Sequence, residues 1–353
     1  MTRILIVRLG AMGDVIHALP AVTALRAALP EAHIGWAIEE RWAELLCASE
    51  VDSEDECTGR GPAMPLVDAV HFVNTQAWRQ APFSDETWAE VRGTFRALRE
   101  LRYDVALDFQ GSLKSAAVTA LSGAARRVGS KRPWESTAAL FYTHPVEVRS
   151  AHVVEQALEL ASAVAGKHLH YLPPSLPLDP ADEKWASEVA ARNREKFVVL
   201  SPGAGWGAKQ WPAERYGKLA GALADAGYDV LVNHSPAEKT LADQVKQASD
   251  GGAHPIECSI SELTALLRRA KLVVGGDTGP VHLAAALEVP VLALFGPTDP
   301  KRTGPFGTRA TVLRSAASAT SHARRAETEA GLLAITVEEA IAAVRALLEE
   351  PRG

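Results

Sequence analysis

The segment VVGGDTGPVHLAAAL, residues 273–287, changes character in its middle. It opens as an apolar run with the length of a buried strand, stops at two glycines, and continues with the apolar spacing of a helix. Polar side chains gather at the join, where Asp277 and Thr278 are followed one turn later by His282. A strand that ends in this way is typical of α/β proteins, which bind ligands beyond the carboxyl ends of their strands.

Strand and helix patterns alternate on both sides of this segment. In the N-terminal half, short apolar runs separated by stretches with helical spacing occur at residues 3–10, 33–40, 68–74 and 103–111. A second series occurs in the C-terminal half, at residues 196–205, 228–234, 254–259, 271–277 and 289–296. Such alternation predicts parallel sheets with crossover helices. The chain is therefore expected to be an α/β protein with two Rossmann-like domains that face each other across a cleft.

A proline-rich stretch at residues 171–185 marks the expected boundary between the two series. Several prolines in a short polar segment continue neither a helix nor a strand, so this composition indicates a linker. The expected N-terminal domain is then residues 1–170, and the expected C-terminal domain is residues 186–335. A last amphipathic helix is predicted at residues 336–350, and we expect it to pack back on the N-terminal domain.

Length and composition exclude several classes of protein. The chain has 353 residues, which suits two domains, and its net charge of -6 does not favour nucleic acid as a partner. The three cysteines, Cys47, Cys57 and Cys258, lack the spacing of a zinc site or a disulfide framework, so a reducing compartment is expected. The N-terminus lacks the pattern of a signal peptide, and no apolar stretch approaches the roughly 20 residues that span a bilayer. We therefore expect a cytoplasmic protein.

The join at Asp277 has two interpretations. Pro280 suits the first helical position, so Gly279 is expected to cap the helix and His282 to lie in its first turn. The free backbone N–H groups at such a helix start, together with the helix dipole, favour an anion. The alternative is that Asp277 or Thr278 only caps the helix by satisfying these N–H groups.

Two glycine-containing loops point to similar chemistry. SPGAGWGAKQWP, residues 201–212, follows the first strand of the C-terminal half and carries one lysine, Lys209, which could supply a positive charge for phosphate. RLGAMGDVIHALP, residues 8–20, follows the first strand of the chain and has Gly13 and Asp14 at the start of a helix. A carboxylate there could act as a general base, although it would also serve as a helix cap.

Motifs of other nucleotide-binding proteins are missing. The loop after the first strand has Gly10 and Gly13 but no GxGxxG, which argues against a nicotinamide-dependent oxidoreductase. The chain has neither a Walker motif nor a DxD motif, so we expect no metal ion and no cofactor. A binding module without catalytic activity is a further alternative, and the presence of both Asp14 and Lys209 argues against it.

The ordered set of motifs resembles the family 9 glycosyltransferases, the ADP-heptose:lipopolysaccharide heptosyltransferases of the GT-B fold. The matching motifs are MGDVIHALPA from Met12 onward, Lys209 followed by QWP, and GGDTGPVHLAAAL with FGPTDP in the C-terminal half. The N-terminal motifs are most similar to heptosyltransferase I, which adds the first heptose to the Kdo sugar of the inner core. The loop SPGAGWG is closer to heptosyltransferase II.

The resemblance implies a role for each motif. In the family the Asp of MGDV is the proposed catalytic base, which is Asp14 here, and the Lys near the WP pair contacts the donor phosphates, which is Lys209 here. The other donor-binding residues carried over are Asp277, Thr278, Gly279 and His282 for the diphosphate and its sugar, Glu238 for the ribose, and Ser201 and Gly203 beside the adenosine and phosphates.

The acceptor side departs from the family pattern. Heptosyltransferase I typically carries a dense run of Arg and Lys on a loop of its N-terminal half, and only Arg79 remains of that run here. The acceptor-binding residues that we expect are Gly13, Arg79, Lys114 and Arg132, with Arg60, Arg126, Arg127 and Lys131 as further basic candidates.

The resemblance implies an inverting, metal-independent transfer of heptose from ADP-heptose to a Kdo–lipid A acceptor. Asp14 would take the proton of the attacking hydroxyl group, and Lys209 with the helix start at Thr278 would stabilise the leaving ADP. The protein would associate peripherally with the cytoplasmic face of the inner membrane, where such an acceptor is anchored. The alternatives are a heptosyltransferase II-like enzyme and another GT-B transferase or epimerase that uses a UDP- or GDP-sugar.

Overall fold

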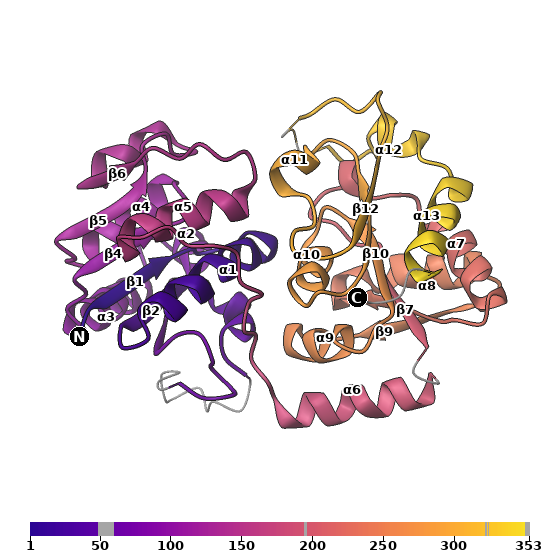
Figure 1. Ribbon diagram of the computed structural model, residues 1–353, viewed down its shortest axis with the longest axis horizontal. Coiled ribbons are helices and arrows are strands. Elements are labelled where there is room, and N and C mark those ends of the chain that lie inside the picture. Colours follow the sequence, from indigo (N-terminus) through magenta and orange to yellow (C-terminus); the bar gives the residue numbers. More distant parts are fainter. Residues whose placement is uncertain (49–59, 194–195, 322, 324, 350–353) are drawn as a thin grey trace. The chain divides into compact units, whose positions relative to one another are not determined.

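The computed structural model describes residues 1–48, 60–193, 196–321, 323 and 325–349, and it divides into two compact units, Met1–Asp179 and Pro180–Gly353. Each unit contains one six-stranded sheet, and every pairing between neighbouring strands is parallel (Figure 1). The prediction of an α/β protein with two parallel sheets is therefore confirmed.

The sheet of the N-terminal unit has the strand order β3-β2-β1-β4-β5-β6. Its strands are β1 (Arg3–Val7), β2 (His33–Ile38), β3 (Ala69–Phe72), β4 (Val105–Asp108), β5 (Arg126–Ser130) and β6 (His144–Val146). Residues 4–7 of the central strand β1 are fully buried, as expected where helices cover both faces of a parallel sheet. The sequence patterns miss β5 and β6, because RRVGS and HPV contain few apolar residues.

Helices connect these strands in the crossover arrangement. They are α1 (Met12–Ala28), the 3₁₀ helix η1 (Glu40–Leu45), α2 (Thr75–Gln80), α3 (Asp85–Glu100), α4 (Leu113–Leu121), the 3₁₀ helix η2 (Ser136–Phe141) and α5 (Val153–Ala165). α1 starts beyond β1 and α4 starts beyond β4. Because β1 and β4 are hydrogen-bonded neighbours, the loops that precede α1 and α4 lie side by side at the carboxyl edge of the sheet.

The sheet of the C-terminal unit has the strand order β12-β11-β10-β7-β8-β9. Its strands are β7 (Phe197–Ser201), β8 (Asp229–His234), β9 (Ala253–Glu257), β10 (Leu272–Gly276), β11 (Val291–Phe295) and β12 (Ala310–Arg314). β7 and β10 pair directly, so the SPGAGWGAKQWP loop and the GGDTG join lie at neighbouring strand ends.

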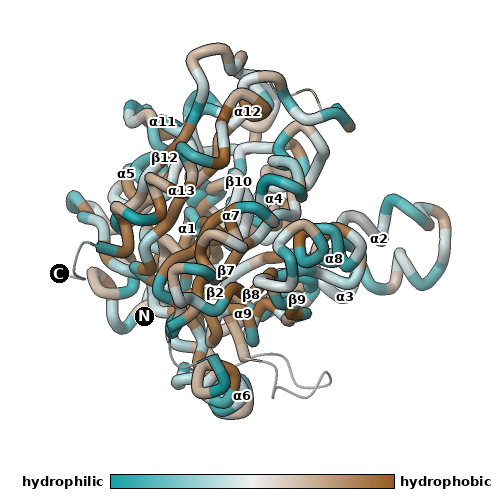
Figure 2. The backbone as a smooth tube through the Cα atoms, turned by 90° about the vertical axis from the view of Figure 1, so that its right-hand side faces the viewer, coloured by the Kyte–Doolittle hydropathy of each residue, from teal (hydrophilic) through white to brown (hydrophobic). Residues whose placement is uncertain are grey.

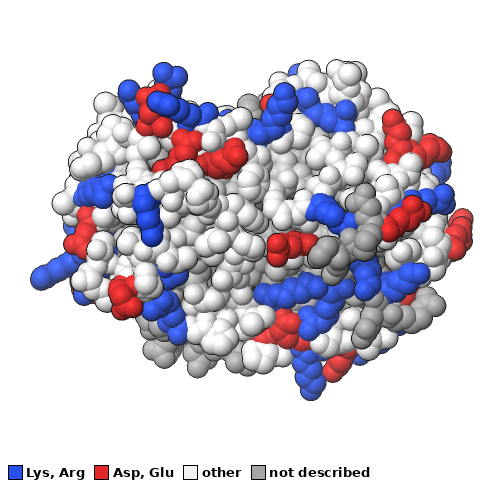
Figure 3. Space-filling model, viewed as in Figure 1, with Lys and Arg blue, Asp and Glu red and all other residues white. Residues whose placement is uncertain are grey.

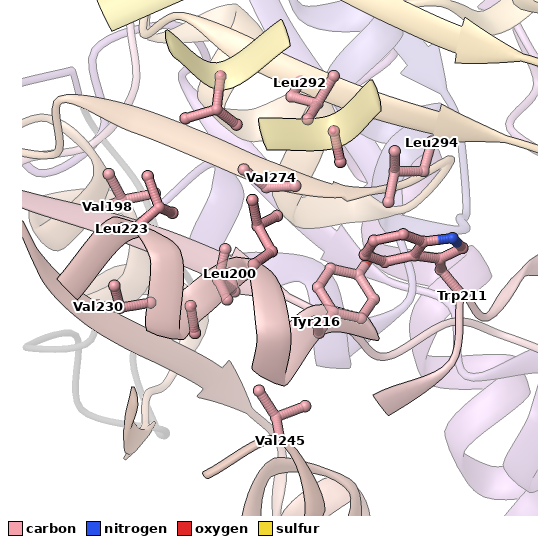
Figure 4. Close-up of a cluster of buried hydrophobic side chains, with 14 of the residues drawn as sticks. Val198, Leu200, Trp211, Tyr216, Leu223, Val230, Val245, Val274, Leu292 and Leu294 are labelled. Atoms are coloured by element: carbon pink, nitrogen blue, oxygen red, sulfur yellow. The ribbon is translucent and has the colours of Figure 1, made fainter. Parts of the chain in front are cut away.

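A dense apolar core lies between this sheet and its helices. Val198, Leu200 and Val274 of the strands belong to one apolar cluster with Trp211 and Tyr216 (Figure 4). Trp211 lies near the end of the glycine-rich loop, and Tyr216 follows the loop. In Figure 2 the strands β7 and β10 are mainly brown, whereas α6 alternates between teal and brown. Two of these strands carry the loops of the candidate donor site, so those loops start from a rigid base.

The helices of the C-terminal unit follow the same alternation. They are α6 (Pro180–Arg192), the 3₁₀ helix η3 (Gly207–Lys209), α7 (Ala213–Asp225), the 3₁₀ helix η4 (Pro236–Glu238), α8 (Lys239–Ala248), α9 (Ile260–Leu267), α10 (Gly279–Ala286), α11 (Pro300–Thr303), α12 (Ala330–Ala334) and α13 (Val337–Glu349). The predicted helix at 336–350 is therefore present as α13, and residue 350 lies outside the described residues.

The position predicted for this last helix is wrong. Ala340, Val344 and Leu347 belong to the apolar core of the C-terminal unit, and α13 lies beside α7 (Figure 1). Its apolar face is buried within the C-terminal unit. The amphipathic pattern indicates that one face of a helix is buried, but it does not indicate which sheet covers that face.

The predicted linker, residues 171–185, is helical in its last part. α6 begins at Pro180, because the fixed backbone angle of proline suits the first turn of a helix. Within the C-terminal unit, Glu183 of α6 pairs with Arg269 at 2.7 Å and also with Arg268. The boundary between the units lies after Asp179, later than the predicted end of the N-terminal domain at residue 170.

Two observations concern the protein as a whole. Cys47 and Cys258 carry free thiols, and Cys57 lies outside the described residues. Among the helices that the structure describes, none is both long enough and apolar enough to cross a membrane.

Candidate donor site and candidate base

The helix start after β10 lacks the side-chain cap that one interpretation of the sequence required. α10 begins at Gly279 and its capping residue is Thr278, one residue before the predicted cap. The Thr278 hydroxyl group does not bond to the helix but donates to the Gly276 carbonyl oxygen at 3.4 Å. The Asp277 carboxylate binds other side chains. The interpretation of these residues as a simple helix cap is therefore wrong, and the helix start has the arrangement that binds anions.

Lys209, Asp277 and His282 form one buried network at this helix start. Lys209 Nζ donates to Asp277 Oδ2 at 2.6 Å and to the Asp277 carbonyl oxygen at 3.2 Å. His282 Nε2 lies 2.9 Å from Asp277 Oδ1. The side chains of Lys209 and Asp277 are only 12% and 6% exposed. The structure thus brings together three residues that the sequence predicted for the donor site.

The charges of this network keep Asp277 ionised. Burial alone would raise the pKa of the Asp277 carboxyl group, because it disfavours the charged form. The hydrogen bonds and charges of His282 and Lys209 outweigh burial and hold this pKa well below its usual range. An ionised carboxylate orients the Lys209 ammonium group before any ligand arrives. A lysine held beside a helix start can bind a diphosphate through charge-assisted hydrogen bonds.

Trp206 and Gly276 contact Lys209 from two sides. The Lys209 ammonium group lies 4.5 Å from the centroid of the Trp206 ring, which is a cation–π contact. A Cβ atom on Gly276 would lie 3.0 Å from the Lys209 carbonyl oxygen, so this glycine lets η3 approach the end of β10. Sequence reasoning missed Trp206, for which the available signal was an aromatic residue three positions before the lysine.

Ser201, Gly203 and Glu238 lie at or just beyond the carboxyl ends of the neighbouring strands β7 and β8. Ser201 is the last residue of β7 and is buried, and Glu238 ends η4. A Cβ atom on Gly203 would lie 2.0 Å from Glu238 Oε1, so the carboxylate rests directly on the glycine-rich loop. Glu238 Oε2 accepts hydrogen bonds from the Ser235 backbone N–H at 3.0 Å and from its hydroxyl group at 2.7 Å. These bonds hold the residue predicted for the ribose beside the loop predicted for the phosphates.

Asp14 in the N-terminal unit is the third residue of α1 and not its cap. The helix begins at Met12, the capping position belongs to Ala11, and Gly13 is the second helical residue. Asp14 Oδ2 accepts a hydrogen bond from the Ala11 backbone N–H at 3.2 Å, and Oδ1 pairs with Arg8 Nη2 at 2.7 Å. The Asp14 side chain is 46% exposed, so it is open to solvent while its orientation is fixed.

Arg8 connects this carboxylate to the next strand. Its Nη1 donates to the Phe109 carbonyl oxygen at 2.8 Å, in the loop after β4. That loop is fixed by Asp108, whose buried carboxyl group has a pKa raised by burial, and by Gln110, whose Oε1 accepts from the Leu9 backbone N–H at 3.0 Å. Sequence reasoning missed Arg8, because an ion pair between residues six positions apart follows no helix or strand period.

The predicted acceptor-binding residues fall into separate places. Arg79 Nε donates to the Thr75 carbonyl oxygen at 3.2 Å, and Lys114 Nζ donates to Thr75 Oγ1 at 3.4 Å, so both side chains bind the first residue of α2. Arg132 follows β5 and pairs with Glu147 at 3.7 Å. The further basic candidates bind as follows: Lys131 to Glu147, Arg60 to Asp68, Arg126 to the Ala163 carbonyl oxygen, and Arg127 to the Phe141 carbonyl oxygen.

Charges of both signs are interspersed on the face of the molecule seen in Figure 3. Gly13, Arg79, Lys114 and Arg132 remain candidate acceptor contacts. Within the described ranges, no group of three His, Cys, Asp or Glu side chains could hold a metal ion.

A lysine and a helix start at neighbouring strand ends of a parallel α/β unit are typical of proteins that bind a phosphate-bearing ligand, as nucleotide-sugar transferases do. Comparison with known proteins identifies the family within this class. Residues 91–333 match the family model of glycosyltransferase family 9 (heptosyltransferase). The chain belongs to this family and is a glycosyltransferase.

Individual relatives agree with this assignment. Lipopolysaccharide heptosyltransferase 1 of Escherichia coli K12 is 32% identical over 321 residues, which cover 89% of this chain and 93% of that protein. The solved structure of E. coli heptosyltransferase WaaC with ADP has a TM-score of 0.77 at 28% identity and covers 98% of this chain and 100% of its own. WaaC with ADP-2-deoxy-2-fluoro heptose gives a TM-score of 0.74 at 27% identity, with 98% and 99% coverage.

Proposed function

We propose that this glycosyltransferase moves heptose from ADP-heptose to the Kdo inner core of lipopolysaccharide, as a heptosyltransferase I-like enzyme. The observation that carries the proposal is the buried Lys209–Asp277–His282 network at the start of α10. It offers cationic and helix-terminal hydrogen-bond donors to a diphosphate, and the similar E. coli enzyme WaaC has been solved with ADP. The similarity to lipopolysaccharide heptosyltransferase 1 over most of the chain supports the Kdo acceptor.

The donor would bind to the C-terminal unit. Lys209 and the first-turn backbone N–H groups of α10 would bind the diphosphate, with Thr278, Gly279 and His282 next to the sugar. Glu238 would accept hydrogen bonds from ribose hydroxyl groups, and the loop from Ser201 to Gly203 would border the nucleoside. As the bond between the anomeric carbon and the phosphate oxygen breaks, negative charge grows on ADP. The prearranged ammonium group stabilises that charge more than it stabilises the intact donor.

Asp14 would serve as the general base of an inverting displacement. Its carboxylate would take the proton of the acceptor hydroxyl group while the acceptor oxygen bonds to the anomeric carbon from the face opposite ADP. The ion pair with Arg8 keeps the carboxylate oriented, and its exposure leaves it accessible. Arg79, Lys114, Arg132 and the backbone at Gly13 would contact the anionic acceptor. No step uses a metal ion, since the leaving group is stabilised by the chain itself.

This proposal also locates the reaction. A Kdo–lipid A acceptor is anchored in a bilayer, so the enzyme would work at the cytoplasmic face of the inner membrane and associate with it peripherally. The unit Met1–Asp179 would form the acceptor domain, and the unit Pro180–Gly353 the donor domain.

A transfer assay in EDTA tests the function. The protein is incubated with ADP-heptose and either Kdo–lipid A or the same acceptor already carrying one heptose, and the products are analysed by mass spectrometry and NMR. We expect the mass of one heptose to be added to the heptose-free acceptor, with the anomeric configuration opposite to that of the donor. Transfer only to the heptosylated acceptor would indicate a heptosyltransferase II-like enzyme. A strict need for Mg²⁺ would contradict the metal-independent mechanism.

A further inference from the structure

The glycine-rich loop of the donor site is held by a segment that no motif predicted. This bracket segment, Arg325–Glu329, precedes α12 and is distant from the loop in sequence. The Ala208 N–H donates to the Arg325 carbonyl oxygen at 3.1 Å, and the Glu329 N–H donates to the Ala208 carbonyl oxygen at 3.3 Å. Ala208, the residue before Lys209, is thus bonded to the bracket segment through both of its backbone groups.

Two more contacts join the same pair of segments. Thr328 Oγ1 donates to the Gln210 carbonyl oxygen at 2.9 Å. A Cβ atom on Gly207 would lie 1.6 Å from the Ala326 carbonyl oxygen, so only glycine lets the two backbones come this close. The bracket segment therefore contacts residues on both sides of Lys209 in the chain.

The bracket segment is itself anchored. Glu329 Oε2 accepts hydrogen bonds from the Leu332 backbone N–H at 2.8 Å and from the Ser318 hydroxyl group at 3.1 Å. Leu332 is fully buried in the apolar core of the C-terminal unit. The Lys209 carbonyl oxygen thus lies close to Gly276 at the end of β10, and the residues on both sides of Lys209 contact a segment fixed to the core.

We propose that the bracket segment positions Lys209 for the donor diphosphate, with Gly207 and Thr328 as the positioning residues. This inference rests on the proposed function, because it requires that Lys209 binds the diphosphate. No residue of the bracket segment needs to touch the donor. A displaced ammonium group loses contact with phosphate oxygens, whereas the contacts to adenosine, made elsewhere in the loop and at Glu238, persist.

The first test compares two alanine substitutions in one loop. Gly207→Ala inserts a methyl group against the Ala326 backbone, whereas Gly205→Ala is a matched control, since a Cβ atom there meets no heavy atom within 4 Å. ADP and adenosine are titrated calorimetrically into both variants and the wild type, with thermal melting as the check of folding. We expect Gly207→Ala to weaken ADP binding about tenfold, the loss of one charge-assisted contact. Adenosine binding, and both affinities of Gly205→Ala, should stay within about twofold of the wild type, well below the tenfold loss of such a contact.

A second pair of variants covers the case in which Gly207→Ala does not fold. Thr328→Val removes the hydroxyl group that binds Gln210 and keeps the shape of the side chain, while Thr328→Ser keeps the hydroxyl group. We expect the Val variant to lose ADP affinity selectively over adenosine and the Ser variant to retain it. A purely structural role would lower both affinities together.

A double-mutant cycle separates this inference from the function on which it rests. If Gly207 and Thr328 act through Lys209, neither substitution should weaken ADP binding further in a Lys209→Ala background. Failure of the wild type to bind ADP would overturn the proposed function. Wild-type ADP binding with unchanged affinity in Gly207→Ala and Thr328→Val, equal losses for ADP and adenosine, or effects that add to those of Lys209→Ala would overturn the positioning role alone.

Discussion

The two regions that carry the proposed chemistry are built in different ways. In the C-terminal unit, Asp277 and His282 are buried, the Lys209 side chain is only 12% exposed, and both Lys209 and His282 bind Asp277. In the N-terminal unit, Asp14 is 46% exposed and is held by Arg8 and one backbone N–H group. The first arrangement fixes charges before a ligand arrives, and the second leaves a carboxylate accessible. The difference suggests that the C-terminal region determines donor binding and that the N-terminal region determines turnover.

Replacing the proposed base should have the largest effect and should spare donor binding. Asn at position 14 can still accept the bond from the Ala11 N–H, but it cannot take up a proton. We expect Asp14→Asn to lower kcat by at least about 100-fold, the lower end for loss of a general base, with ADP affinity within about twofold of the wild type. Turnover is measured by the heptose-transfer assay and ADP affinity by calorimetry. Glu31→Gln, an exposed acid just beyond the end of α1, is the control. Near-normal turnover of Asp14→Asn would reduce Asp14 to a structural role.

Removing the donor-site lysine should reverse this profile. Lys209→Ala deletes the cation that is proposed to bind the diphosphate, which should raise the Kd for ADP about 10- to 100-fold, as for hydrogen bonds to charged groups. It also leaves the buried Asp277 carboxylate with one partner fewer, so the melting temperature should fall. Calorimetry and thermal melting measure both effects. Lys239→Ala, at an exposed lysine that starts α8, should change neither. Unaltered ADP affinity would remove Lys209 from the phosphate role.

The smallest effect is expected at the ribose. Glu238→Ala should weaken ADP binding about 5- to 10-fold, which corresponds to roughly one hydrogen bond of 1–1.5 kcal/mol. It should also shrink the preference for ADP over 2′,3′-dideoxy-ADP, measured by calorimetry. Glu214→Ala, an exposed acid at the start of α7, is the control. If Glu238→Ala discriminates between these nucleotides as well as the wild type does, the carboxylate does not read the ribose.

Strand order explains why the donor network could be anticipated from the sequence. Lys209 and Asp277 lie in loops after β7 and β10, and two apolar strand patterns followed by glycine-rich loops suffice to predict parallel strands with functional loops at one edge. The 2.6 Å ion pair between Lys209 and Asp277 was not predictable. A sequence pattern indicates where a strand ends, but not which side chains beyond it contact one another. The one-residue shift of the α10 cap from Gly279 to Thr278 has a similar origin, since both residues suit a helix start.

Sequence patterns missed or wrongly predicted the features that depend on tertiary contacts. The bracket segment has no periodic apolar pattern. Two of its hydrogen bonds with residues 207–210 join backbone groups that any sequence carries, and the third comes from the Thr328 hydroxyl group. The destination of α13 depends on which sheet covers its apolar face, and the end of the linker depends on where Pro180 starts a helix. Edge strands such as β6 contain too few apolar residues to form a recognisable run. The positions of these elements depend more on their tertiary contacts than on their own residue types.

Nucleotide titration into the wild-type protein is the most direct test of the proposed ADP-sugar donor. ADP, UDP, GDP and NAD are titrated calorimetrically in the presence of EDTA, before any substitution is made. We predict that ADP alone binds, and that it binds without a divalent metal ion. Clear binding of UDP, GDP or NAD with no binding of ADP would contradict an ADP-sugar donor and the assignment of Lys209, Asp277 and His282 to it.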